Sequence, residues 1–138
     1  MKYEEKHMDL FDVDESYFLA HCISADYNLG AGIAVEFNKH FNLTPTLIYI
    51  NRNKYPDCIP IKRVFNLVTK QNYWDMPTYK DLERALKIMK GLAVRHNVNK
   101  IAMPRIGCGL DHLVWENVKY IVKEVFDETD IEILICIK

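Results

Sequence analysis

A glycine-bearing loop between two apolar segments is the strongest candidate for chemistry in this sequence. It runs from Pro104 to Asp111, follows the apolar residues 101–103 and precedes a helical pattern that begins near Leu113. A strand that turns through glycines into a helix start presents backbone N–H groups at the positive end of the helix dipole. Such a loop suits an anionic ligand, in particular a phosphate or diphosphate.

A second loop of the same design lies nearer the start of the chain. Its sequence, Leu29-Gly30-Ala31-Gly32-Ile33, follows the apolar run 18–23 and leads into apolar residues at helical spacing. Either loop alone is weak evidence, because glycine is also the default residue wherever a turn needs a positive φ. Together the two loops predict the two walls of one anion-binding cleft.

Lys70 and Asp111 are the candidate reactive side chains of this cleft. Lys70 ends an apolar strand pattern, and Asp111 follows the second loop. An ordinary lysine is neutral in on the order of one molecule in a thousand at pH 7. A nucleophilic lysine therefore requires desolvation, a nearby cation or a partner that takes its proton. The alternative interpretations are a solvated lysine at a strand end and an aspartate that caps a helix.

Cysteine and histidine offer other chemistry, with less support. Cys108 lies between two glycines, but no histidine follows it in a helpful register, so we expect a thiol that packs against or lines the cleft. His21 and Cys22 are adjacent on a predicted strand and therefore point to opposite faces. We expect no metal site. The aromatic residues Tyr73 and Trp74 are expected to form a packed lid over the core rather than part of the site.

Alternating strand and helix patterns position these residues. Strands that are apolar on both faces and alternate with helices predict an α/β fold, a three-layer α/β/α sandwich. Ligands bind such sheets beyond the carboxyl ends of the strands, where both glycine loops fall. We predict strands over 3–8, 17–23, 46–50, 64–69, 100–104 and 131–137, a loop over 51–62, and helices over 32–41, from Pro77-Thr78 onward and after Leu113-Val114.

Length and composition exclude several classes of protein. A chain of 138 residues with 49% apolar residues predicts one domain over residues 1–138 with a well-supplied core. The 18 basic and 19 acidic residues are mixed along the chain, which argues against a protein held on nucleic acid by bulk electrostatics. Four cysteines without C-x-x-C spacing predict free thiols and a cytoplasmic location. No signal peptide and no apolar run of membrane-spanning length is visible.

These segments resemble the macrodomain family of ADP-ribose-binding α/β/α modules, and the resemblance implies a mixed central sheet. The resemblance is strongest to the subclass that includes terminal ADP-ribose protein glycohydrolase and O-acetyl-ADP-ribose deacetylase. It covers nearly the whole chain, weakens between Asn42 and Lys62, and is most specific at the second loop. The segments that carry it are residues 9–11 (DLF), 20–24 (AHCIS), 30–35 (GAGIAV), 67–70 (LVTK), 77–79 (PTY), 103–111 (MPRIGCGLD) and 115–118 (WENV).

The resemblance implies roles for individual residues. Lys70 would attack the anomeric carbon of the distal ribose, and Asp111 would act as general acid and base. Asp9 would accept a hydrogen bond from the adenine amino group, and the diphosphate would lie across Gly30–Ile33 and Arg105–Leu110. Some relatives carry an aromatic residue near the chain end, where this sequence has Lys138. The implied ADP-ribose contacts are Asp9, Leu10, Ser24, Leu29, Gly30, Ala31, Gly32, Ile33, Val68, Arg105, Ile106, Gly107, Cys108, Gly109, Leu110 and Lys138.

The resulting expectation is a monomeric hydrolase that releases ADP-ribose from ester-type linkages. Its substrates would be ADP-ribosylated acidic side chains or O-acyl-ADP-ribose, and it would need no metal or dissociable cofactor. Three alternatives remain open from the sequence: a binding-only module, an ADP-ribose 1″-phosphate phosphatase and a hydrolase of ADP-ribosylated DNA. The net charge of −1 mildly disfavours the last of these.

Overall fold

Six strands form one sheet in the order β1-β6-β5-β2-β4-β3. The computed structural model describes residues 1–138. Every neighbouring pair is parallel except β3 and β4, which are antiparallel, so the predicted mixed sheet is confirmed. The strands are β1 (Lys2–His7), β2 (Phe18–Ser24), β3 (Asp57–Ile61), β4 (Val64–Lys70), β5 (Lys100–Met103) and β6 (Glu132–Ile137).

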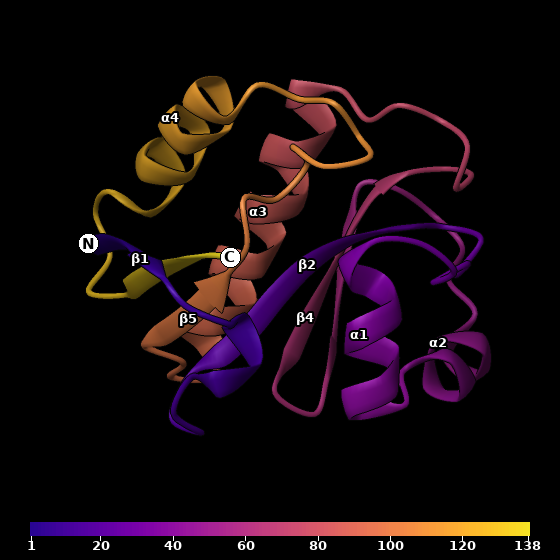
Figure 1. Ribbon diagram of the computed structural model, residues 1–138, viewed down its shortest axis with the longest axis horizontal. Coiled ribbons are helices and arrows are strands. Elements are labelled where there is room, and N and C mark those ends of the chain that lie inside the picture. Colours follow the sequence, from indigo (N-terminus) through magenta and orange to yellow (C-terminus); the bar gives the residue numbers. More distant parts are fainter.

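Helices cover both faces of the sheet, which confirms the three-layer architecture. Figure 1 shows α1 and α2 on one side of the strands and α3 and α4 on the other, and each side has its own buried apolar cluster. No helix combines the length and the apolar sequence needed to cross a bilayer. The helices are α1 (Ile33–Phe41), α2 (Thr44–Ile50), α3 (Tyr79–Arg95) and α4 (Trp115–Phe126), with a short 3₁₀ turn η1 (Leu10–Asp12) before β2.

Helix α3 shows how local sequence signals produce an element. The Thr78 side chain caps it by accepting a hydrogen bond from the Asp81 N–H at 3.1 Å, as the approximate capping box predicts. Leu82, Leu86 and Met89 follow at helical spacing and are fully buried against the sheet. The start of α3 also fixes the end of the segment 71–78, which follows Lys70 and contributes residues 73–76 to a cavity.

Two expectations between α1 and β4 are wrong. Residues 46–50 form the end of helix α2 rather than a strand, because Leu43, Leu47 and Ile50 point inward at a spacing of four and three residues. The predicted loop over 51–62 contains strand β3, which pairs with β4 at the edge of the sheet. Pro60 led us to expect a loop, but it lies in β3, and an edge strand tolerates a residue that has no N–H to donate.

His21 lies on β2 with its ring buried beneath α1. The ring is fully buried and stacks on Phe37, with ring centroids 3.9 Å apart. Its Nε2 donates to the Asn66 side-chain oxygen at 2.7 Å, because the Asn66 amide nitrogen itself donates to the Ile59 carbonyl. Nδ1 has no partner. Burial therefore lowers the pKa of His21 to about 4, although the hydrogen bond with Asn66 opposes that shift.

We expect stability to fall as the pH drops from 6.5 toward 4. In that interval His21 takes up a proton in the unfolded chain but not in the native one. Acid therefore lowers the free energy of unfolding by up to about 3 kcal/mol. Chemical denaturation at a series of pH values measures this effect. His21→Gln, whose amide can still donate to Asn66, is the control and should show a shallower slope. Identical slopes in the two proteins would contradict the assignment.

Candidate functional site

A cavity of about 950 Å³ opens where the carboxyl ends of β2, β4 and β5 run into their following loops. Both glycine loops line it, together with the ends of β2 and β4 and the segment 73–76. The two walls predicted from the sequence therefore lie in one site. The predicted site residues that line this cavity are Ser24, Gly30, Ala31, Gly32, Ile33, Lys70, Arg105, Ile106, Gly107, Gly109, Leu110 and Asp111.

The first glycine loop ends at the N-terminus of α1. Gly32 precedes the helix with φ of 62°, and no side chain caps the helix there. The N–H groups of Ala31, Gly32 and Ile33 make no hydrogen bond within the protein. The Gly30 N–H, however, donates to the side-chain oxygen of Asn28 at 2.9 Å. Three N–H groups of the predicted anion-binding loop are thus free to bind a ligand, whereas the N–H of Gly30 is already hydrogen-bonded within the protein.

The second glycine loop faces the first. The Cys108 N–H donates to the Arg105 carbonyl at 3.2 Å, whereas the N–H groups of Gly109 and Leu110 make no hydrogen bond within the protein. A Cβ built on Gly32 would lie 3.4 Å from Cδ1 of Leu110, so the two loops are in contact. The loop does not pass directly into α4, because residues 111–113 intervene and Val114 is the N-cap residue.

Gly107 and Gly109, the two glycines of the second loop, differ in backbone conformation and in the space around them. Gly107 has φ of 72°, and a Cβ there would lie 2.9 Å from Cδ1 of Leu113, whereas Gly109 has no positive φ and faces open space. We therefore expect Gly107→Ala to lower the free energy of unfolding by about 1–2 kcal/mol. Gly109→Ala is the matched control and should change it little. Thermal and urea unfolding of the two variants test this, and equal losses would contradict it.

Lys70 and Asp111 meet inside the cavity. The Lys70 ammonium donates to Asp111 Oδ1 at 2.6 Å and to the Tyr73 carbonyl oxygen at 3.0 Å. The two side chains are only 13% and 15% exposed, so Lys70 is not a freely solvated lysine at a strand end. Asp111 does not cap α4, since Val114 holds that position. At this separation a proton can pass directly from the amine to the carboxylate.

The neighbouring thiols are held in their neutral form. Burial raises the pKa of the Cys22 thiol, and the nearby charge of Asp111 raises it further. Burial also raises the pKa of Cys108, whose sulfur donates to the Ile106 carbonyl at 3.3 Å. Because the thiolate is the reactive form, neither cysteine is a good nucleophile. No three His, Cys, Asp or Glu side chains gather where they could hold a metal ion.

Six residues predicted to contact ADP-ribose do not line this cavity. Leu10, Leu29 and Val68 are buried in the apolar cluster beneath α1. Asp9 accepts hydrogen bonds from the Phe11 N–H at 2.9 Å and from the Lys138 ammonium at 3.1 Å, and these two bonds lower its pKa. Cys108 is turned toward its own loop. The ligand contacts of these six residues stay predictions.

Several residues that line the cavity were not predicted from the sequence. Tyr73 and Trp74 are 55% and 67% exposed, so they do not form the packed lid over the core that we expected. Their rings make an edge-to-face contact at 5.0 Å beside Lys70. Two aromatic residues within four positions of Lys70 were the available signal. The other cavity residues not predicted are Cys22, Ile23, Asn28, Ala34, Asp75, Met76 and Pro104.

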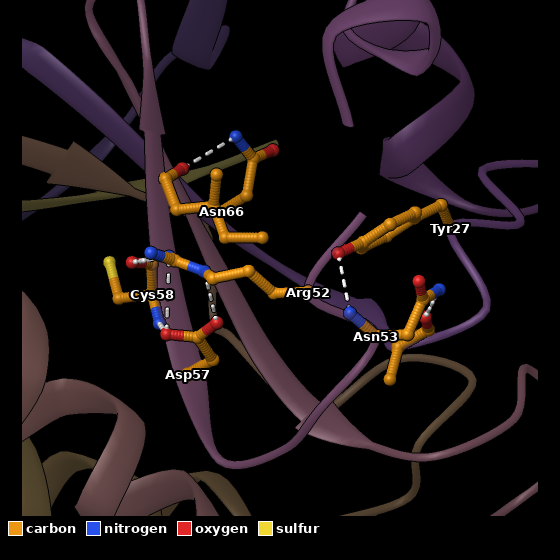
Figure 2. A network of polar contacts seen from close by, with 8 residues as sticks. Tyr27, Arg52, Asn53, Asp57, Cys58 and Asn66 are labelled. Atoms are coloured by element: carbon orange, nitrogen blue, oxygen red, sulfur yellow. Dashed lines mark hydrogen bonds and ion pairs between the residues drawn. The ribbon is translucent and has the colours of Figure 1, made fainter. Parts of the chain in front are cut away.

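The loop between α2 and β3 braces the backbone that leads into the first glycine loop. Asn53 donates from its N–H to the Tyr27 hydroxyl at 2.9 Å and from its side chain to the Ala25 carbonyl at 2.8 Å (Figure 2). Arg52 anchors this loop to β3 through the buried Asp57, with Nε 3.0 Å from Oδ2, and through the Cys58 carbonyl at 3.3 Å. Residues 25–27 are therefore fixed from outside the cavity.

Comparisons with known proteins agree with this fold. No family profile matches the chain. The human protein named ADP-ribose glycohydrolase OARD1 is 42% identical over 131 residues, which cover 92% of this chain and 86% of the human protein. The macrodomain of Thermus aquaticus DarG has a TM-score of 0.86 at 18% identity and covers 97% of both chains. Thermosipho africanus DarTG in complex with ADP-ribose has a TM-score of 0.77 at 15% identity, over 90% of this chain and 39% of that longer one. This chain therefore belongs to the macrodomain family, in the group of ADP-ribose glycohydrolase OARD1.

Proposed function

We propose that this macrodomain releases ADP-ribose from ester-type linkages, with Lys70 as the nucleophile and Asp111 as the general acid and base. Binding of ADP-ribose and its removal from modified substrates follow from the relationship to ADP-ribose glycohydrolase OARD1. One observation carries the assignment of residues. Lys70 and Asp111 form a 2.6 Å pair within the same cavity as two glycine loops with unpaired backbone donors.

The two loops suit the diphosphate of ADP-ribose. Unpaired N–H groups of Ala31 and Gly32 lie on one wall and those of Gly109 and Leu110 on the other. Backbone N–H groups at a helix N-terminus stabilise phosphate through hydrogen bonds and through the helix dipole. With the diphosphate between the loops, the distal ribose would extend toward Lys70 and Asp111.

The pair can carry out hydrolysis in two steps. Lys70 passes a proton to Asp111, and the free amine then forms a bond to the anomeric carbon. The bond from that carbon to the ester oxygen breaks, and its electron pair leaves with the carboxyl group, which can take the proton from Asp111. Water then adds to the same carbon while Asp111 takes its proton, and the bond to Lys70 breaks to release ADP-ribose and the amine.

No metal or dissociable cofactor enters these steps, because proton transfer and nucleophilic attack come from protein side chains. A cytoplasmic location is supported by four unpaired cysteines. We also propose that the protein acts as a monomer. O-acyl-ADP-ribose is the second expected substrate, since an acyl group on its anomeric oxygen forms the same kind of ester.

Release assays on defined linkages test the proposal. Calorimetry with ADP-ribose should first show binding by the wild-type protein. The protein should then release ADP-ribose from peptides that carry it on glutamate, and it should hydrolyse O-acyl-ADP-ribose. ADP-ribose linked to serine should stay attached. Binding without turnover of any ester would identify a binding-only module. Release of inorganic phosphate from ADP-ribose 1″-phosphate would favour the phosphatase alternative, and release from thymidine-linked ADP-ribose alone would favour a DNA substrate.

A further inference from the structure

Asp26 joins the two sides of the site through three hydrogen bonds. Its Oδ1 accepts from the Ser24 hydroxyl at 2.5 Å and from the Asn28 N–H at 3.0 Å. Its Oδ2 accepts from the Tyr73 N–H at 2.9 Å. One carboxylate thus connects the loop after β2 with the segment after β4. Asp26 itself does not line the cavity, so any effect on the reaction must pass through these partners.

The Tyr73 bond leads to the reactive amine. Tyr73 donates its N–H to Asp26, and its carbonyl oxygen accepts one of the two hydrogen bonds that hold the Lys70 ammonium. The other is the bond to Asp111. The position of Tyr73 therefore sets the direction from which the Lys70 nitrogen approaches Asp111 and the cavity.

The Asn28 bond leads to the first glycine loop. Asn28 donates its N–H to Asp26, and its side-chain oxygen accepts from the Gly30 N–H at 2.9 Å. A Cβ on Gly30 would lie 2.7 Å from that oxygen, so a larger residue here would displace the Asn28 side chain from its hydrogen bond. Asp26 therefore supports the wall proposed to hold the diphosphate as well as the amine.

The backbone around Asp26 is itself held in place. Its N–H donates to the Gln71 carbonyl at 3.1 Å, and the Ala25 N–H donates to the Lys70 carbonyl at 2.8 Å. Asn53 binds Ala25 and Tyr27 on either side (Figure 2). Burial opposes ionisation of Asp26, but the hydrogen bonds from Ser24, Asn28 and Tyr73 outweigh it and lower its pKa. The acceptor is thus a fixed, charged carboxylate.

We propose that Asp26 is a positioning residue for the reaction, which holds Lys70 in its reactive place through Tyr73 and the first glycine loop through Asn28. This role rests on the proposed function of Lys70. A reactive group misplaced by even an ångström can lose a large part of its rate, so a support of this kind has a measurable effect.

Asp26→Asn separates the two connections. The asparagine oxygen can keep the bonds from Ser24 and Asn28, and its NH₂ group then faces the Tyr73 N–H, where two donors repel each other. We expect kcat on glutamate-linked ADP-ribose to fall by about 10- to 100-fold, while the Kd for ADP-ribose changes less than about threefold. Asp26→Ala removes all three acceptors and should weaken both kcat and binding.

A second measurement reads the position of Lys70 without any turnover. Acetylation by an N-hydroxysuccinimide ester, followed by peptide mass spectrometry, should modify Lys70 slowly in the wild type and faster in Asp26→Asn. Asp14→Asn is the matched control, because Asp14 accepts from the Ser16 N–H at 2.7 Å in a turn remote from the cavity. That variant should match the wild type in kcat, Kd and labelling of Lys70.

The outcomes distinguish this inference from the proposed function. Unchanged labelling of Lys70 and unchanged kcat in Asp26→Asn would overturn the role of Asp26. Equal losses in kcat and ADP-ribose binding in Asp26→Asn, accompanied by a lower Tm, would also overturn it and would indicate a general loosening of the site. If the wild-type protein hydrolyses no ester, the proposed function fails, and the labelling rates still decide whether Asp26 holds Lys70.

Discussion

Lys70→Arg should abolish hydrolysis of glutamate-linked ADP-ribose while ADP-ribose still binds. The guanidinium keeps the positive charge and can pair with Asp111, but it does not lose a proton in proteins and so cannot act as a nucleophile. We expect kcat to fall on the order of a thousandfold or more. Single-turnover release assays measure the loss, and calorimetry with ADP-ribose measures binding.

The choice of arginine separates chemistry from electrostatics. If Lys70 served only to pair with Asp111 at 2.6 Å, the arginine variant would retain most of its activity. Lys87→Arg is the matched control, because Lys87 pairs with Glu83 on the exposed face of α3 and lies outside the cavity. Substantial turnover by Lys70→Arg would contradict a nucleophilic lysine.

Asp111→Asn should have the second largest effect. The amide has nearly the same shape as the carboxylate, yet it can neither accept the proton of Lys70 nor return it to a leaving group. We expect kcat to fall by about 100- to 10,000-fold, the range for the loss of a general acid or base. Asp130→Asn, in the turn before β6, controls for the loss of a charge elsewhere on the surface.

Asp111→Asn also tests the order of events. A variant that still forms the bond to Lys70 but releases ADP-ribose slowly would accumulate a covalent adduct, which intact-protein mass spectrometry detects. A variant that cannot free the Lys70 amine would show no adduct and no turnover. Full activity in Asp111→Asn would contradict the proposed role of the carboxylate.

Much of the fold could be predicted because its elements have strong periodicity. The apolar stripe of α3, with Thr78 before it, and the apolar strands β4 and β6 are local signals. The failures lie between residues 42 and 62. There a short helix carries β-branched residues on its exposed side, and an edge strand contains Pro60. In both cases tertiary packing overrides the local preference.

The site was predictable where chemistry depends on residue type, and less so where it depends on hydrogen bonds between distant segments. The glycines could be chosen from type and position, and the pair of Lys70 and Asp111 from type and position together with the resemblance to macrodomains. Asp26 and Asn28 could not, because their importance arises from bonds to Tyr73 and Gly30 that only the folded chain forms. The same holds for Asn53, which binds Tyr27 and Ala25, residues that lie 26 and 28 positions earlier in the sequence.

The two outer strands of the sheet have a consequence for behaviour at high protein concentration. β1 presents the charged side chains of Lys2, Glu4 and Lys6 to water, and β3 carries an exposed proline. An outermost strand with free backbone groups invites a strand of another molecule to pair with it, and charge or proline there discourages such growth. Both edge strands of this sheet are therefore poor templates for cross-β association. This property favours a chain that stays dispersed when concentrated.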